Sequence, residues 1–572
     1  MYVFALILIA FLAKAQSVIS LSPAGGGAGL QPLMKIRFAG SVEPEAMRSR
    51  VAIRWGDAAQ TVGFTTYPVG YLMPINEVAW DPATNTLYAK PDEALDQDRD
   101  FELIVSGPGN TTLATSRFHT RNVTSALLAR DLGPAASIRR ILPRVFDLNE
   151  VKALTALNQT SADPAAALSP QPYPVTTSFM SSLGIRRLVF LRYTSSRGDT
   201  VDVHAWIPNA PKPVGGYPVV LIGHGFGDSR LYGPSFLATG VIANSVVMAI
   251  DAVGHGYGPG SQMRLDMVDG TTINVPLSGR GRDLDGDGKI DPGEGCIILA
   301  PGVPDLTNTC FRETVLDYRK LVREIQSGID LDGDGANDLD PNRIRYIGQS
   351  YGAMYGTILV AIEGGIEAAV LNVGGSSSLE GFRYSATGQK TLQLLIASIA
   401  PELAGVKDPL LGRWEAVRRL SDPRTGRYLE LIDVLATAGA DASPASFAPF
   451  LKQASLYGNP IKRVLFQYAT GDQTIGNPTT GQLLRAAFEY ELVSVYRHDL
   501  ARADLPSLPE DPHTFMAAFS AFDQPPALII GLAALTQAGQ FLASGQREVP
   551  DVNPIVRLAF KQNLFGVPSV LP

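Results

Sequence analysis

Residues 345–352 read RYIGQSYG, and this stretch decides the fold we expect for the second half of the chain. It is an apolar strand that runs into Gly-x-Ser-x-Gly and then into the apolar segment 351–363, which has helical character. A sharp strand-to-helix turn of this kind presents a serine hydroxyl above a sheet, and its two glycines leave room for the crowded backbone. Ser350 is therefore the predicted nucleophile. The alternative is a structural turn that matches the pattern by chance.

The segments around this turn alternate between strand and helix patterns. Short apolar runs at 217–222, 245–250, 344–347, 368–372 and 463–468 fit buried parallel strands, and residues 311–326 have helical spacing. Residues 187–193 and 201–207 indicate a leading hairpin. The pattern predicts an α/β-hydrolase fold over residues 176–560, a mostly parallel sheet with helices on both faces. Residues 376–460 are too long for a simple connection and are expected to form a cap.

A serine nucleophile needs a base, and the base needs a carboxylate that orients it. In this fold the chain order is serine, acid, histidine. Only His498 and His513 follow Ser350. His513 lies in a proline-rich loop and is the predicted base, whereas His498 continues a helical pattern and is expected at the surface. Asp472 follows the strand 463–468 and is the predicted acid, although a Gly-Asp pair is also a common turn.

The oxyanion hole needs two backbone N–H groups. One is expected from Tyr351, directly after the nucleophile. The other is expected from Phe226, in the loop Gly223–Gly227 that follows the third strand. His224 and His255 precede Ser350, so the chain order argues against either of them as the base.

Two aspartate-rich runs predict structural calcium and no cofactor for catalysis. The first, 283–294, matches an EF-hand loop throughout. The second lacks the final glutamate because Pro341 stands there, so metal binding at that run is left open. In both runs the alternative is a solvated acidic loop. The candidate ligands are Asp283, Asp285, Asp287, Lys289, Asp291 and Glu294 in the first run and Asp330, Asp332, Asp334 and Asp338 in the second.

The first 175 residues indicate three further regions. Residues 1–15 fit a secretory signal peptide with a small-x-small cleavage site, and the alternative is a buried strand. Residues 17–122 show short alternating runs and turn residues, which predict a small all-β sandwich. Residues 123–175 are expected to be a connector with short helices at 125–131 and 149–158. No later run of about 20 apolar residues was recognised, so no stable membrane anchor is expected.

Length, charge and cysteine content limit the classes of protein that fit the chain. The chain has 572 residues, 45% of them hydrophobic, and a net charge of −7. The length favours two domains, and the absence of a basic stripe gives no reason to expect a nucleic-acid partner. Cys296 and Cys310 are the only cysteines and lie in a glycine- and proline-rich loop. In an exported protein such a pair usually forms a disulfide, and the alternative is two buried thiols.

The motifs resemble a known family. Residues 332–352, read as DGDGxxDLDPxRIxYxGQSxG, resemble bacterial extracellular lipases of the virulence-factor lipase type, as do Gly471–Thr474 and residues 537–542. The resemblance implies an esterase or lipase with Ser350, Asp472 and His513 as its triad. Residues 17–122 similarly resemble bacterial Ig-like domains. The chain has Tyr351 where many of these lipases have leucine, which leaves the preference for acyl chain length open.

These observations predict a secreted or periplasmic serine hydrolase that acts on carboxylic esters, whether a lipid, a small ester or a polyester. Two alternatives remain at this point. One is a peptidase or acyltransferase with the same triad. The other is a calcium-dependent surface-binding protein with a degenerate hydrolase domain. The sequence leaves the oligomeric state open.

Overall fold

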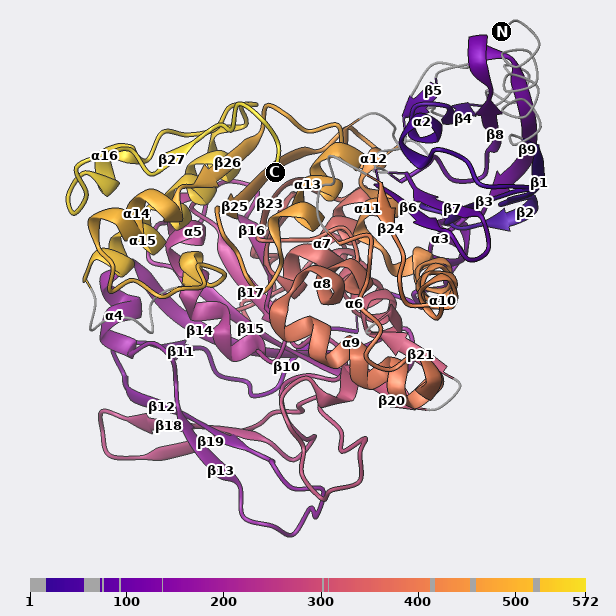
Figure 1. Cartoon of the computed structure of the whole chain (residues 1–572). Helices are drawn as coiled ribbons and strands as arrows, with labels where there is room; N and C mark the ends of the chain where they lie inside the picture. Colours follow the sequence, from indigo (N-terminus) through magenta and orange to yellow (C-terminus); the bar gives the residue numbers. More distant parts are fainter. Residues whose placement is uncertain are drawn as a thin grey trace, which may run out of the picture. The chain divides into compact units, whose positions relative to one another are not determined.

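The computed structural model describes residues 17–55, 72–74, 77–91, 94–135, 137–300, 303–306, 308–411, 417–452, 459–517 and 525–572. The expected signal peptide at 1–15 lies outside these residues. The chain divides into two compact units (Figure 1). Unit 1 comprises residues up to Ala126 together with Leu299–Pro304 and Phe382–Asp441. Unit 2 comprises the remaining residues up to Pro572.

The N-terminal part of unit 1 is built from β-strands in two five-stranded sheets, with the orders β1-β3-β7-β6-β24 and β2-β9-β8-β4-β5. Alternate side chains of both sheets point into a shared apolar core that contains Phe38, Trp80 and Phe101. The elements are β1 (Val18–Ser22), β2 (Gly25–Ala28), β3 (Met34–Phe38), α2 (Pro44–Arg48), β4 (Val51–Trp55), β5 (Leu72–Pro74), β6 (Glu77–Asp81), β7 (Thr86–Lys90), β8 (Asp100–Ser106), β9 (Thr112–Thr120) and α3 (Ser125–Leu128).

The segment expected to be a cap is divided between the two units. Residues Phe382–Asp441, which include α9 (Ala386–Ile399) and α10 (Thr425–Ala438), belong to unit 1. The short strand β24 (Arg418–Arg419) pairs in parallel with β6 at Ala79 and Trp80, and the Leu33 amide donates to Asp433 in α10 at 2.7 Å. An open sheet edge accepts such a strand readily. The expected boundaries, a single cap at 376–460 within the catalytic domain, are therefore not those of the structure.

Unit 2 contains a mixed sheet in the order β10-β14-β15-β17-β16-β22-β23-β25-β26-β27. The neighbouring strands from β17 to β26 in this order are parallel to one another, whereas β15 is antiparallel to β14 and β17, and β27 is antiparallel to β26. This order fits the expected α/β-hydrolase fold, and the leading hairpin is confirmed. The strands are β10 (Arg139–Arg140), β11 (Phe146–Asp147), β14 (Ile185–Thr194), β15 (Thr200–Pro208), β16 (Tyr217–Gly223), β17 (Val246–Ile250), β22 (Leu339–Gln349), β23 (Ile366–Asn372), β25 (Arg463–Ala469), β26 (Val493–Tyr496) and β27 (Phe565–Gly566).

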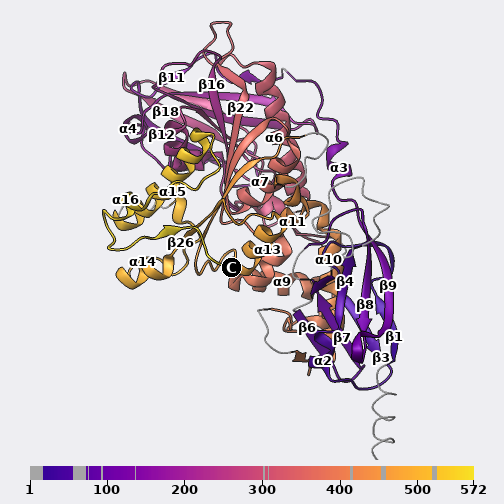
Figure 2. The same ribbon diagram turned by 90° about the horizontal axis from the view of Figure 1, so that it is seen from above.

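Helices cover both faces of this sheet (Figure 2). On one face α5 and α15 pack into a core with Val220, Val247 and Ile347. On the other face α6 contacts α7, and Tyr318 packs edge-on against Tyr346 of β22. The helices are α4 (Thr177–Ser182), α5 (Leu237–Ile242), α6 (Asn308–Ser327), α7 (Tyr351–Ile362), α8 (Ser378–Tyr384, which spans the boundary between the units), α11 (Pro444–Phe447), α12 (Pro449–Lys452), α13 (Asn477–Ala486), α14 (His498–Asp504), α15 (Pro525–Ser544) and α16 (Asn553–Val556).

Helix α15 corrects one expectation. Among the described residues, it is the one helix long and apolar enough to cross a membrane, so a late apolar run of this length does exist. Most of the helix is buried, and Ile530, Leu535 and Phe541 lie in the core beside the sheet. Burial of this kind is typical of a core helix, which passes the same test of length and composition.

The expected connector is more ordered than the sequence indicated. The helix expected at 149–158 is wrong, because Val151–Asn158 forms strand β12. It pairs with β13 (Ser169–Pro172) and with β18 (Gln262–Met267), which also pairs with β19 (Thr272–Pro276). Its partner β18 lies about a hundred residues further along the chain, and local periodicity carries no information about such a pairing.

Candidate active site

Strand β22 and helix α7 meet at Ser350 in a strained turn. Ser350 has φ 55° and ψ −119°, a combination that residues other than glycine rarely adopt. Its amide donates to the Asn372 carbonyl of β23 at 2.8 Å, which holds the turn against the sheet. A Cβ on Gly348 would lie 2.3 Å from the Gly352 carbonyl oxygen, so a side chain there is excluded. The glycines on either side of Ser350 thus allow the sharp turn that presents the serine hydroxyl at the end of β22.

The structure brings the three predicted catalytic side chains together. Ser350 Oγ lies 2.7 Å from His513 Nε2. His513 Nδ1 lies 2.8 Å and 3.0 Å from the two carboxylate oxygens of Asp472. A carboxylate only accepts hydrogen bonds, so Nδ1 carries the proton and Nε2 is left to accept the serine proton. All three residues are buried, with exposed fractions of 9% or less. This is the hydrogen-bonded chain that activates a serine.

The backbone orients the Asp472 carboxylate. Asp472 follows β25, and its Oδ1 accepts hydrogen bonds from the amides of Thr474 at 3.0 Å and Ile475 at 2.8 Å. These two local hydrogen bonds restrain the orientation of the Asp472 carboxylate. Its own loop therefore orients the carboxylate independently of His513.

Asp511 joins the acid loop to the histidine loop, and the sequence did not single it out. Its Oδ1 accepts from the amides of Gln473 at 3.0 Å and His513 at 3.1 Å. Its Oδ2 accepts from Thr474 Oγ1 at 2.7 Å. One side chain thus bridges two segments that are 38 residues apart in sequence. Asp511 touches none of the reacting atoms in these contacts and is a positioning residue.

We expect Asp511→Ala to lower kcat by about tenfold to a hundredfold, because small displacements of a base from its nucleophile have effects of this size. KM should change little, since no substrate contact is removed. Asp511→Asn keeps one acceptor oxygen and should recover part of the loss. Steady-state kinetics on a small ester measure both values. A change in KM alone would contradict the positioning role.

In the described part of the chain, none of the other histidines of unit 2, which include His204, forms a hydrogen bond with Ser350. Burial lowers the pKa of His224 to about 4 and that of His255 to about 3, so both are neutral at physiological pH. His498 is buried, which corrects the expected surface position. Its Nδ1 faces the Tyr496 hydroxyl at 3.1 Å, and its Nε2 faces the Pro509 carbonyl oxygen at 2.9 Å, in the loop that leads to His513.

The expected oxyanion loop lies beside the nucleophile. A Cβ on Gly225 would lie 3.9 Å from Ser350 Cβ, which places the loop after β16 against the serine. The Phe226 ring packs edge-on against His255 and Tyr351, with centroid distances of 5.2 Å and 5.6 Å. Tyr351 is the first residue of α7, so its amide lies at the positive end of a helix. Both predicted donors thus belong to segments that adjoin Ser350.

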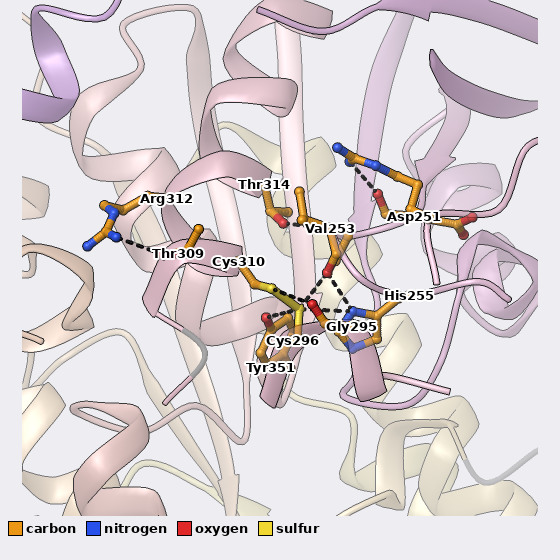
Figure 3. Close-up of a disulfide and its surroundings, with 12 residues drawn as sticks. Asp251, Val253, His255, Gly295, Cys296, Thr309, Cys310, Arg312, Thr314 and Tyr351 are labelled. Atoms are coloured by element: carbon orange, nitrogen blue, oxygen red, sulfur yellow. Dashed lines mark hydrogen bonds between the residues drawn. A yellow bond between two sulfur atoms is a disulfide. The ribbon is translucent and has the colours of Figure 1, made fainter. Parts of the chain in front are cut away.

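The predicted disulfide is confirmed, and it lies next to this cluster (Figure 3). Cys296 and Cys310 are bonded, with their Cα atoms 5.7 Å apart. The Tyr351 hydroxyl lies 3.4 Å from Cys296 Sγ. Cys310 lies in helix α6, whose Phe311 ring packs on Tyr351 at 4.6 Å. The disulfide therefore links the end of the acidic loop covalently to helix α6, and Tyr351 packs against both the disulfide and this helix.

The two aspartate-rich runs differ in their surroundings. In the first, carboxylate oxygens of Asp283, Asp285 and Glu294 lie within 4.8 Å of one another, and no described arginine or lysine pairs with these three. Asp287, Lys289 and Asp291 lie outside this group, and Asp287 pairs with Lys289 at 3.3 Å.

In the second run Asp330, Asp332 and Asp338 form a similar group, and Asp334 lies outside it. Two cations of the protein already pair there. Arg187 lies 3.4 Å from Asp332, and Lys212 lies 2.7 Å from Asp338. The first run is therefore the better candidate for a divalent cation, because its converging carboxylates lack such counter-charges.

Comparisons with known proteins give distant structural similarities only. No family model and no curated protein matches the chain. Among solved structures, it is similar to acetyl xylan esterase 1 from Thermoanaerobacterium sp. JW/SL YS485, at 16% identity over 62% of this chain and 93% of that chain, with a TM-score of 0.34.

Two further structures are an acetyl xylan esterase from Paenibacillus sp. R4 and EstE1, a thermophilic carboxylesterase cloned from a metagenomic library. The first is 14% identical over 56% of this chain and 83% of its own, with a TM-score of 0.37. The second is 15% identical over 64% of this chain and 92% of its own, with a TM-score of 0.34.

Proposed function

We propose that this protein is a serine hydrolase that cleaves carboxylic esters through an acyl-enzyme on Ser350. The observation that carries the proposal is the hydrogen-bonded chain from Ser350 Oγ through His513 to Asp472, with 2.7 Å between Ser350 Oγ and His513 Nε2. The strained backbone of Ser350 supports it, because strain at a catalytic turn has to be maintained by the surrounding fold. An intact site of this kind disfavours a binding protein with a degenerate hydrolase domain.

The geometry implies the following reaction. Ser350 Oγ attacks the ester carbonyl carbon while His513 Nε2 accepts its proton, and Asp472 stabilises the imidazolium that forms. The amides of Phe226 and Tyr351 are proposed to hold the developing oxyanion. The tetrahedral intermediate expels the alcohol, which takes the proton back from His513. Water, activated by the same histidine, then attacks the acyl-enzyme, releases the acid and regenerates the serine hydroxyl.

Substrate turnover separates this proposal from a peptidase or an acyltransferase on the same triad. The purified protein should hydrolyse p-nitrophenyl esters and show no cleavage of an unstructured peptide. With an alcohol acceptor present, free acid should remain the main product. Peptide cleavage at a comparable kcat/KM, or transfer as the main outcome, would replace the proposed activity. An ester series of increasing chain length defines the acyl preference, which Tyr351 leaves open.

We further propose that the loop 283–294 binds calcium as a structural ion. Its three converging carboxylates repel one another unless a cation neutralises them. The loop already has a curved form, because the amides of Gly286 and Gly288 donate to the two oxygens of Asp283 at 2.7 Å and 2.9 Å. The residues proposed to hold the ion are Asp283, Asp285 and Glu294. No catalytic step involves the metal.

Calcium should raise the melting temperature, because an ion that binds only the folded state stabilises it by about 2.7 kcal/mol at a hundredfold excess over Kd. A melt with millimolar calcium is compared with one in excess EGTA. Asp285→Ala with Asp287→Ala should abolish the difference. Asp163→Ala with Asp269→Ala, exposed residues outside both runs, should preserve it. Identical curves for the wild-type protein under the two conditions, with no calcium found by elemental analysis, would reject the metal site.

We also propose that the protein is exported and that its N-terminal β-domain is Ig-like. The apolar segment at 1–15 supports secretion, and the disulfide agrees with an oxidising compartment. The Ig-like nature of the β-domain and the resemblance to extracellular lipases are part of this proposal as well. Ester substrates are the proposed partners, whereas no nucleic acid and no stable membrane anchor are expected. A cell-fractionation experiment that follows ester hydrolysis tests the location.

A further inference from the structure

Asp228 places a carboxylate beside the nucleophile, and neither the motifs nor the triad account for it. A Cβ on Gly225 would lie 2.9 Å from Asp228 Oδ2 and 3.9 Å from Ser350 Cβ. The acid and the serine therefore flank the same point of the oxyanion loop. The Asp228 amide donates to the Gly225 carbonyl at 3.2 Å, which closes a tight turn and holds the side chain there.

Asp228 is half-buried and lacks the counter-ion that three fully buried acids of unit 2 have. Asp202, Asp251 and Asp317 each form an ion pair with an arginine. In the part of the chain that the structure describes, no arginine or lysine forms an ion pair with Asp228. An unpaired carboxylate in a partly buried position costs stability, so its presence beside a reactive serine indicates a functional role.

The Asp228 carboxylate is ionised at the mildly alkaline pH at which ester hydrolysis is tested below. Burial raises the pKa of Asp228 to about 6, whereas a hydrogen bond from Gly225 and the charge of His513 act in the opposite direction. The neighbouring Tyr232 is affected in turn, because its own burial and the charge of Asp228 raise its pKa to about 12. At pH 8, above this pKa, Asp228 is therefore mostly ionised, and it lies beside Ser350.

We propose that Asp228 is a specificity-determining residue, which disfavours esters with a negative charge near the scissile bond and favours esters with a cationic group there. This inference rests on the proposed ester hydrolase function and deepens it. A charge within a few ångströms in a partly desolvated site interacts strongly enough to change kcat/KM by at least tenfold. The expected substrates are thus neutral or cationic esters.

Two pairs of esters test the charge effect at pH 8. Dimethyl glutarate and monomethyl glutarate differ by one carboxylate, and acetylcholine and 3,3-dimethylbutyl acetate differ by one positive charge at nearly equal shape. The wild-type protein should prefer the first member of each pair. Asp228→Asn, which keeps the size of the side chain, should lower both preferences by at least tenfold. Each preference is a ratio of kcat/KM values, so a general loss of activity or folded fraction cancels.

Two further variants keep the result interpretable. Asp228→Glu retains the charge and should retain both preferences, even if its kcat falls. Glu548→Gln removes an exposed carboxylate elsewhere in unit 2 and should leave the ratios unchanged. Ratios in Asp228→Asn within twofold of the wild type would overturn the inference while the esterase proposal stands. Absence of ester turnover by the wild-type protein would instead reject the proposed function.

Discussion

Replacing Ser350 by alanine should lower kcat for ester hydrolysis by about 10⁴- to 10⁶-fold, which is the effect expected when the nucleophile of a serine hydrolase is lost. The structure gives the reason. Of the described side chains, Ser350 is the one whose hydroxyl lies within hydrogen-bond distance of His513 Nε2. No acyl-enzyme can form without it. The substitution removes one oxygen from a turn held by backbone contacts, so the melting temperature should stay close to that of the wild type.

A matched control separates loss of the nucleophile from loss of folding. Ser178→Ala removes an exposed serine hydroxyl and should keep full activity. Both variants are compared by initial rates on a p-nitrophenyl ester and by thermal melts. Turnover by Ser350→Ala within tenfold of the wild-type rate would contradict the assignment of the nucleophile. A large drop in its melting temperature would require a second test, with Ser350→Cys, before the assignment is kept.

His513→Ala should lower kcat by a similar factor, because the base and the nucleophile act as one unit. His498→Ala should behave differently. The structure buries His498 against Tyr496 and Pro509, so its loss leaves two polar groups without their partner and should cost about 1–3 kcal/mol of stability. Its effect on kcat should be small, because His498 forms its hydrogen bonds with Tyr496 and Pro509 and not with Ser350. The surface position expected from the sequence would make this substitution nearly silent, whereas the buried position predicts a loss of stability.

The two variants, His513→Ala and His498→Ala, are compared by their kcat values and by urea denaturation. Rates at saturating ester concentration report the base, and urea midpoints report stability. If His498→Ala lost several orders of magnitude in kcat while remaining folded, and His513→Ala did not, the base would be assigned wrongly. The hydrogen bond between His513 Nδ1 and Asp472 would then need another explanation.

Chain order and local motifs predict the three side chains that the structure brings into one hydrogen-bonded chain, and the reason is physical. The turn at Ser350 requires glycines at fixed spacing, which a sequence displays directly. Asp472 could be placed because a strand end precedes it. Asp511 and Asp228 could not be placed in this way, since their importance comes from contacts across the fold. Asp511 accepts from the Gln473 amide, and Asp228 lies against Gly225 beside Ser350. No periodicity in the chain records such contacts.

In the fold, too, local sequence patterns predict some elements, whereas pairings between remote segments are not predicted. Buried parallel strands such as β16 have wholly apolar runs and were recognised. The helix predicted at 149–158 is wrong, because β12 forms there and pairs with β18, which is remote in sequence. The assignment of residues 382–441 to unit 1 depends on β24 pairing with β6, again across several hundred residues. Propensity and pattern are weak guides where tertiary pairing decides the conformation.

Covalent labelling tests the central claim most directly. Diethyl p-nitrophenyl phosphate reacts with an activated serine: the Ser350 oxygen forms a bond to phosphorus, p-nitrophenolate leaves, and His513 takes the serine proton. We predict one diethylphosphoryl group per chain, found by mass spectrometry on the peptide that contains Ser350, with ester hydrolysis falling in proportion to labelling. Complete labelling at another residue, or full inhibition of ester hydrolysis with Ser350 unmodified, would contradict the account.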